Sequence, residues 1–357
     1  MNEIVLGSFF GDEGKGQVVH NLCKSHPLKQ TIVVRFSGGH QVGHTVRHGK
    51  LEHTFSNFGC GTLLGVPTYW SQYCTVDPIT SIKELQDLNK LGIHPEIIYN
   101  PLCEVVIPFD VITQWNDKKN LKHGSVGTGF KAALDRVAAG YHITVVDCLN
   151  PLVLREKIIA ILDNYYNLDG YDIMLNVNDW CLQASGYFNS VNIKSETYLN
   201  QFTFKVFEGS QGILLDQKFG IMPYCTPSNT TCQNAVEIIN KLEKEETRNI
   251  FVIRPYITRH GNGPIPSMKD VIEVNDPNNK FNEFQKTMRC IKFDSKLLEH
   301  VVIVNSIYRV PGSSNMLYLT HSDETNDSFF KDFDLSMFNR VYKSFYDSSI
   351  FYDTKSL

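Results

Sequence analysis

An apolar run that enters a glycine-rich turn and leaves as a predicted helix is the feature that most constrains the fold. Residues 4–6 are Ile-Val-Leu, residues 7–16 contain four glycines, and Val18-Val19 follows. Glycine lets the backbone approach a ligand closely, and the N–H groups at a helix start attract an anion. Asp12 and Lys15 lie in the same turn. The segment predicts a strand, a phosphate-binding loop and a helix, with an ordinary glycine-rich turn as the alternative.

A second glycine-rich segment strengthens the phosphate interpretation. Residues 32–34 are Ile-Val-Val, and Arg-Phe-Ser-Gly-Gly-His-Gln-Val-Gly-His-Thr follows at 35–45. Loops that follow two neighbouring strands line the crevice in which open α/β sheets bind ligands. The first turn is not a Walker A loop, because Gly16 rather than Ser or Thr follows Lys15.

Length and composition are those of a folded enzyme. The chain has 357 residues, 42% of them hydrophobic, and a formal charge of −4, which gives no sign of a nucleic-acid-binding protein. Its nine cysteines form no Cys-x-x-Cys pair, which favours a reducing compartment. No charged-then-apolar leader and no run of ~20 apolar residues is present. We expect one cytoplasmic domain over residues 1–357, with no membrane and no polymeric nucleic acid as partner.

Short β-like runs alternate with stretches of helical periodicity, which predicts a largely parallel sheet flanked by helices. The helical stretches are 153–165 and 235–242. The predicted strands are 4–6, 32–34, 143–146, 173–175, 204–207, 250–253, 301–304 and 316–319.

Three further motifs complete a specific pattern. They are Phe-Glu-Gly-Ser-Gln-Gly-Ile-Leu-Leu-Asp at 207–216, Tyr-Cys-Thr-Pro-Ser-Asn-Thr-Thr at 224–231, and Thr-Arg-His-Gly-Asn-Gly-Pro at 258–264. With the two glycine-rich loops, and in this order, they resemble the adenylosuccinate synthetase family. The third has the family form Thr-Arg-x-Gly-x-Gly-Pro, with His260 at the first variable position.

The resemblance implies an α/β fold, a P-loop-like nucleotide-binding synthetase architecture with loop insertions, and a ligase reaction. A nucleoside triphosphate phosphorylates the 6-oxo group of a purine nucleotide, and the amino group of L-aspartate displaces that phosphate. Asp12 matches the general base and, with the carbonyl of Gly43, a Mg²⁺ ligand. His44 matches the residue that stabilises the transferring phosphoryl group, and Lys15 lies near the reacting phosphate.

Positional matching assigns the remaining site residues. Arg136 is expected to reach the substrate phosphate from a neighbouring subunit, which implies a homodimer; a solvated helix residue is the alternative. Without its neighbours, Asp12 is an ordinary turn former. The residues expected to bind the triphosphate are Gly11, Glu13, Gly14, Gly16, Gly43, Thr45, Thr320, His321 and Asp323. Those expected to bind the substrate nucleotide or aspartate are Gln41, Ser125, Val126, Arg136, Gln211, Thr226 and Arg289.

Two departures from the family pattern bear on the substrates. Arg289 is the lone arginine where the family has an arginine-rich loop, and His321 replaces the lysine of a guanine-reading Thr-Lys-x-Asp motif. With the compact length, these departures resemble phage 2-aminoadenylosuccinate synthetases, which act on dGMP, and favour ATP as donor. Asp12 argues the other way, because the phage group has a smaller residue there. The alternatives are an IMP and GTP enzyme and a nucleotide-binding regulatory protein without activity.

Overall fold

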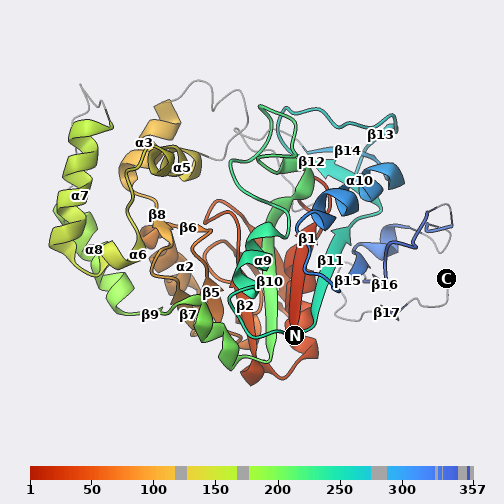
Figure 1. Ribbon diagram of the computed structural model, residues 1–357, viewed down its shortest axis with the longest axis horizontal. Coiled ribbons are helices and arrows are strands. Elements are labelled where there is room, and N and C mark those ends of the chain that lie inside the picture. Colours follow the sequence, from red (N-terminus) through yellow and green to blue (C-terminus); the bar gives the residue numbers. More distant parts are fainter. Residues whose placement is uncertain are drawn as a thin grey trace.

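The computed structural model describes residues 1–116, 127–166, 177–274, 288–325, 329–331, 333–344 and 352–353. Within these residues, ten strands form one central sheet in the order β17-β16-β15-β11-β1-β10-β2-β5-β7-β9. All neighbours pair in parallel except β17, which is antiparallel to β16. The prediction of a largely parallel sheet is confirmed, and its crossovers are the helices seen on either side in Figure 1.

The central sheet contains β1 (Asn2–Gly7), β2 (Thr31–Arg35), β5 (Thr68–Trp70), β7 (Ile97–Tyr99), β9 (Asn192–Ile193), β10 (Phe204–Gly212), β11 (Thr247–Ile253), β15 (Ser314–Leu319), β16 (Arg340–Lys343) and β17 (Tyr352–Asp353). Smaller sheets pair β3 (His44–His48) with β4 (Leu51–Phe55), β6 (Thr75–Val76) with β8 (Glu104–Val105), and β14 (Arg289–Lys292) with both β12 (Tyr256–Arg259) and β13 (Val271–Ile272). The helices are α1 (Lys15–Ser25), α2 (Pro78–Lys90), α3 (Pro108–Asn116), α5 (Phe130–Ala138), α6 (Val145–Cys148), α7 (Pro151–Asn164), α8 (Val177–Asn189), α9 (Gln233–Ile239) and α10 (Ser295–Ser306). Short 3-10 helices occupy Leu28–Gln30, Thr62–Leu64, Glu196–Gln201, Ile213–Leu215 and Ser322–Glu324.

The central strands are buried on both faces of the sheet. Successive side chains of a strand point to opposite faces, so each strand contributes to two hydrophobic clusters. In β1, Ile4 and Leu6 enter one hydrophobic cluster and Val5 enters the other. The first cluster is covered by α9 and α10, and the second by α1, α2, α7 and α8. This double cover explains why the strands are continuous apolar runs in the sequence.

Two predicted strands are wrong. Residues 301–304 lie within α10, where Val301, Val302 and Val304 are buried and Ile303 is 65% exposed. The Asp294 carboxylate caps this helix, so packing and capping outweigh the β preference of four branched residues. Residues 143–146 lead into α6 instead, whose start is stabilised by a capping box between Thr144 and Asp147.

The other strand predictions are confirmed by β1, β2, β10, β11 and β15, and both helix predictions by α7 and α9. The predicted strand at 173–175 lies outside the described residues. All nine cysteines are free thiols. In the part of the chain that the structure describes, no helix is both long and apolar enough to cross a membrane.

The carboxyl ends of the parallel strands meet at one edge of the sheet. In Figure 1 the N-terminus marks the opposite, lower edge, and β12 and β14 lie above the upper edge. The segments that follow β1, β2, β10, β11 and β15 therefore emerge close together, as expected of a ligand crevice.

Candidate active site

The loop after β1 is shaped by the carboxylate of Glu13. Its Oε1 accepts hydrogen bonds from the backbone N–H groups of Phe9 and Gly11, both at 2.9 Å. Its Oε2 lies 2.8 Å from Nζ of Lys15, and both side chains are almost completely buried. Glu13 therefore faces the loop's own donors, and this contact holds the Lys15 ammonium beside the end of β1.

Asp12 lies in the same loop and remains accessible, with 36% of its side chain exposed. Its backbone has a φ of 62°, a left-handed conformation that is uncommon outside glycine. Its Oδ2 lies 2.9 Å from Nε2 of His260, which follows β12. Burial by itself raises the pKa of Asp12, but the hydrogen bond to His260 and the charges of His260, Arg254 and Lys15 together hold that pKa below its usual value. The carboxyl group is therefore ionised at neutral pH.

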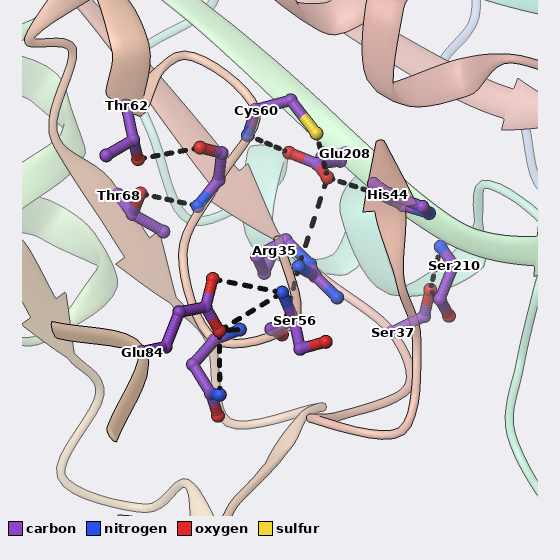
Figure 2. Close-up of polar contacts among 12 residues, drawn as sticks. Arg35, Ser37, His44, Ser56, Cys60, Thr62, Thr68, Glu84, Glu208 and Ser210 are labelled. Atoms are coloured by element: carbon purple, nitrogen blue, oxygen red, sulfur yellow. Dashed lines mark hydrogen bonds and ion pairs between the residues drawn. The ribbon is translucent and has the colours of Figure 1, made fainter. Parts of the chain in front are cut away.

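His44 begins β3, directly after the second glycine-rich loop, and its Nδ1 lies 2.5 Å from Oε1 of Glu208. Glu208 is fully buried in β10 and also accepts a hydrogen bond from the backbone N–H of Cys60 at 2.9 Å. Figure 2 shows this carboxylate between Cys60 and His44, with Arg35 nearby. The Cys60 thiol donates to Oε1 of Glu208 at 3.1 Å, and Nη1 of Arg35 lies 3.9 Å from the same oxygen.

The charge state of this pair follows from its surroundings. Burial opposes ionisation of Glu208, yet the hydrogen bond from His44 and the charge of Arg35 lower its pKa to about 2. Burial lowers the pKa of His44, against the opposite effect of Glu208. The pair is thus a carboxylate and a neutral imidazole whose Nδ1–H donates to Glu208, which leaves Nε2 as the ring nitrogen for a ligand.

The two loops are packed against each other. A Cβ at Gly16 would lie 3.0 Å from Cβ of His44 and 3.1 Å from Sγ of Cys60, so α1 packs closely against the start of β3 at this glycine. The charge of Lys15 also acts on both Asp12 and His44. The tertiary structure therefore brings Asp12, Lys15 and His44 to one end of the sheet, as predicted from two loops that follow neighbouring strands.

Two glutamines have buried amide atoms: Gln41, in the loop between β2 and β3, and Gln211, near the end of β10. Both polar side-chain atoms of Gln41, and Oε1 of Gln211, are buried without a hydrogen-bond partner among the described residues. Gln211 also has a left-handed φ of 56°. Buried polar atoms are normally paired, so these amides have the character of groups that a ligand satisfies. Thr226, the other residue expected beside them, is buried, with its backbone N–H bonded to the carbonyl of Leu215.

The segment after β15 meets the first loop. Oγ1 of Thr320 donates to the carbonyl of Glu13 at 2.6 Å, and a Cβ at Gly14 would lie 3.2 Å from Thr320. His321 is buried, has a φ of 52°, and places Nδ1 3.1 Å from Oγ1 of Thr320, whereas Asp323 is exposed. The expected donor motif thus lies beside the expected phosphate loop.

Two residues expected to bind the triphosphate, Gly43 and Thr45, lie at the end of the second loop and the start of β3. Gly43 is exposed, and Oγ1 of Thr45 lies 2.9 Å from Oγ1 of Thr54. The two groups assigned to Mg²⁺ from the sequence, the carboxylate of Asp12 and the carbonyl of Gly43, are both oxygen donors, the type that suits a hard divalent cation. By contrast, His44, Cys60 and Glu208, whose ligand atoms lie within 4.8 Å of one another, already hydrogen-bond among themselves.

Arg136 is placed differently from either expectation. It is fully buried in α5, where Nε and Nη2 contact the Asp110 carboxylate at 2.9 and 3.1 Å. Nη2 also donates to the carbonyl of Val105 at 2.8 Å, and Nη1 to that of Tyr141. The prediction that Arg136 reaches a phosphate across a subunit interface is wrong, and so is the solvated alternative, because its donors are used inside the fold. Ser125 and Val126 lie outside the described residues.

Arg289 and Arg259 lie opposite each other in the β12–β14 pair. Nη2 of Arg289 donates to the carbonyls of Gly261 and Gly263, so this arginine braces the loop that carries His260. Arg259 lies over the ring of Phe10 at 4.1 Å, and burial, together with the charge of Arg289, lowers its pKa to about 10. Two arginine side chains thus lie at this end of the sheet, beside the segment that carries His260.

Two residues of this site, Glu208 and His260, were not among those predicted from the sequence. Glu208 lies within the motif at 207–216. A single carboxylate directly after the predicted strand at 204–207 was the sequence feature that could have indicated a functional residue. His260 occupies a variable position of its motif, so only the fold shows that it reaches Asp12.

The fold and the arrangement of these loops define an α/β enzyme that handles nucleotides at the carboxyl edge of a parallel sheet. The family model for adenylosuccinate synthetase matches residues 4–323. The chain belongs to the adenylosuccinate synthetase family and is a carbon–nitrogen ligase.

Among curated relatives, adenylosuccinate synthetase of Wigglesworthia glossinidia brevipalpis is 30% identical over 329 residues, which cover 85% of this chain and 75% of the relative. That of Thermodesulfovibrio yellowstonii is 28% identical over 324 residues, covering 85% and 74%.

Two solved structures share the fold. Adenylosuccinate synthetase of Plasmodium falciparum has a TM-score of 0.71 at 21% identity, covering 90% of this chain and 77% of that one. Succinoaminodeoxyadenylate synthetase of cyanophage S-2L, bound to dGMP and dATP, has a TM-score of 0.70 at 14% identity, covering 99% and 95%.

Proposed function

We propose that this ligase joins L-aspartate to carbon 6 of a 6-oxopurine nucleotide through a 6-phosphoryl intermediate, with dGMP as acceptor and ATP as donor. The observation that carries the reaction is the meeting of Asp12, Lys15 and His44 at the ends of β1 and β2. These three groups supply a base, a positive charge and a phosphoryl-stabilising imidazole to one crevice.

Asp12 would remove the proton from the ring nitrogen beside the 6-oxo group, so that the oxygen becomes nucleophilic. Its side chain is partly exposed and its lowered pKa keeps it ionised. A general base of this kind accounts for roughly 10²–10⁴-fold of the rate.

His44 would stabilise the transferring phosphoryl group through Nε2. Glu208 holds Nδ1 and fixes the ring, and negative charge developing on the phosphoryl oxygens favours a proton on Nε2. Lys15 would add a positive charge from the loop side, shared with Glu13.

Asp12 and Gly43 would hold Mg²⁺: both residues are at least partly exposed, and a carboxylate and a carbonyl are oxygen donors of the type that this ion prefers. When bound, the ion would neutralise charge on the donor phosphates. Thr320 and His321 would lie on the donor side, because Thr320 contacts Glu13 and Gly14 of the phosphate loop and His321 contacts Thr320.

The acceptor nucleotide would be held by the buried amides. Gln41 and Gln211 offer polar atoms without partners among the described residues, and Thr226 adds a hydroxyl nearby in the chain segment that follows β10. A purine carries both donors and acceptors at its edge, which amides can match.

Two observations support dGMP and ATP. The described cyanophage structure, which holds dGMP and dATP, covers nearly the whole of this chain and is itself covered almost completely. His321 in place of lysine removes the long apolar stem that the family pattern lays along a guanine base.

IMP with GTP is the second candidate, and specific observations favour it. The chain keeps a carboxylate at position 12, and the curated relatives that match it at 27–30% identity are named adenylosuccinate synthetases.

The test is an assay of the purified protein with L-aspartate and Mg²⁺, crossing dGMP, GMP and IMP with ATP and GTP. Phosphate release and mass spectrometry of the succinylated nucleotide are followed together. We expect the highest kcat/KM with dGMP and ATP. Turnover restricted to IMP and GTP would overturn the choice of substrates, and no succinylated product with any pair would overturn the ligase proposal itself.

A homodimer remains part of the proposal, on the strength of the family resemblance alone, because Arg136 does not contribute to it. Light scattering during size-exclusion chromatography measures the mass directly, and a monomer at assay concentration would remove this part.

A further inference from the structure

The end of β12 touches the phosphate loop at two consecutive points. Oγ1 of Thr258 donates to the carbonyl of Gly11 at 2.8 Å. Two residues later, Nε2 of His260 lies 2.9 Å from Oδ2 of Asp12. Alternate residues of an extended segment point to the same side. Thr258 in β12 and His260 directly after it therefore both face the loop.

The segment that carries His260 is itself braced. Thr258 and Arg259 pair with Cys290 and Arg289 in β14. Nη2 of Arg289 donates to the carbonyl of Gly261 at 2.7 Å and to that of Gly263. The position of His260 is therefore set by a small sheet rather than by a free loop.

Asp12 and Glu13 are neighbours with different partners. Glu13 is occupied by the N–H groups of its own loop and by Lys15, and is 2% exposed. Asp12 has a left-handed backbone and turns its carboxylate out of the loop, where a residue 248 positions later in the chain meets it. An exposed carboxylate on a turn has several staggered orientations, and a contact to one oxygen selects among them.

We propose that His260 is a positioning residue: it binds Oδ2 of Asp12 and so holds the carboxylate with Oδ1 directed to the purine ring N–H. This inference rests on the proposed function, in which Asp12 is the base. Position 260 is a variable position of the family motif, so the resemblance gives it no role. Misplacement of a catalytic group by about 1 Å can cost on the order of 100-fold in rate, and loss of an orienting hydrogen bond commonly costs about 10–100-fold.

The test compares His260→Val, which removes the donor, with His260→Gln, whose side-chain amide can still donate to Oδ2. We expect His260→Val to lower kcat about 10–100-fold with the KM for the acceptor nucleotide changed less than about threefold. His260→Gln should recover most of kcat. His94→Val, which alters an exposed histidine in the segment that follows α2, is the matched control and should leave both constants unchanged.

Equal loss in the Val and Gln variants, or a loss confined to KM, would overturn the positioning role. A crystal structure of His260→Val supplies a readout that needs no turnover. We expect the Asp12 carboxylate to adopt a different side-chain torsion from the wild type, and an unchanged carboxylate would overturn the inference. If the wild type makes no succinylated product, the proposed function fails, whereas the crystal structures still decide whether His260 holds Asp12.

Discussion

Two buried carboxylates with arginine neighbours behave differently in this molecule. Asp110 binds Arg136 through both oxygens and also accepts the hydroxyl of Tyr166, and the arginine and the carboxylate are fully buried. Glu208 lies 3.9 Å from Nη1 of Arg35, and its shorter contacts are the hydrogen bonds from His44 and Cys60. We call the Asp110 network closed, because Asp110 and Arg136 bind only groups inside the fold. The Glu208 network is open, because it ends in the imidazole of His44 at the edge of the sheet.

The difference between the two networks indicates which of them can interact with a ligand. Every polar group of a closed ion pair is used within the fold, so its removal is felt as lost stability. In the Glu208 network, His44 uses Nδ1 to bind the carboxylate, so Nε2 is the ring nitrogen that can meet a ligand. The amides of Gln41 and Gln211 have buried atoms without hydrogen-bond partners among the described residues. These two networks therefore differ in the ring nitrogen that His44 keeps for a ligand, and not in burial or in the presence of charge.

The largest effect is expected from Asp12→Asn, which removes the accessible carboxylate. Loss of a general base costs roughly 10²–10⁴-fold in kcat, and loss of a metal ligand adds to it. Nucleotide binding, measured by isothermal titration calorimetry, should remain. Asp87→Asn, which alters an exposed carboxylate paired with Lys90, is the control. Near-normal turnover of the Asp12 variant would remove this residue from the mechanism.

Arg136→Met tests the closed network. Breaking a buried ion pair leaves an uncompensated charge on Asp110 and costs about 3–5 kcal/mol of unfolding free energy, measured by urea denaturation. Turnover per folded molecule should stay within about twofold of wild type. The comparison between the networks would fail if this variant kept its stability but lost activity.

Glu208→Gln tests the open network. The amide can still accept the Nδ1–H of His44, but it no longer offers that ring a negative charge, so kcat should fall about 10–100-fold. Glu84→Gln is the matched control, because Glu84 is a buried carboxylate that accepts N–H groups of Ser56 and Asn57 and lies apart from His44 in Figure 2. Similar kcat losses in both variants would mean that Glu208 is structural only.

The smallest effect concerns pH and His20. This buried histidine contacts His48 and the carbonyl of Cys60, and burial lowers its pKa to about 4 from a usual 6.5. The unfolded chain takes up a proton below about pH 6.5 and the folded chain does not, so His20 destabilises the fold progressively from pH 6.5 down to about 4. The unfolding free energy should fall by about 1–3 kcal/mol over this interval.

His20→Asn should flatten that dependence, measured by urea denaturation at several pH values. His94→Asn, at an exposed site, should keep the wild-type slope. A slope unchanged in the His20 variant would assign the acid sensitivity to other groups.

The elements that sequence patterns predicted correctly are those with local causes. The run into the first glycine turn becomes β1, the turn and α1, and residues 153–165 become α7, because burial on two faces and helical periodicity both leave a local record. The strand prediction at 301–304 failed because β-branched residues tolerate a helix when a cap and a core lie beside them.

The sequence by itself determined the class of the molecule: glycine positions, strand ends and the order of five motifs are local properties that survive any packing. Only the tertiary structure decided which polar groups meet. His44 contacts Glu208, which lies 164 residues later in the chain. His260 contacts Asp12, and Arg136 pairs with Asp110 inside the fold. A side chain's partner depends on how distant segments pack and on what that packing leaves unsatisfied, and neither is written in the neighbouring residues of the chain.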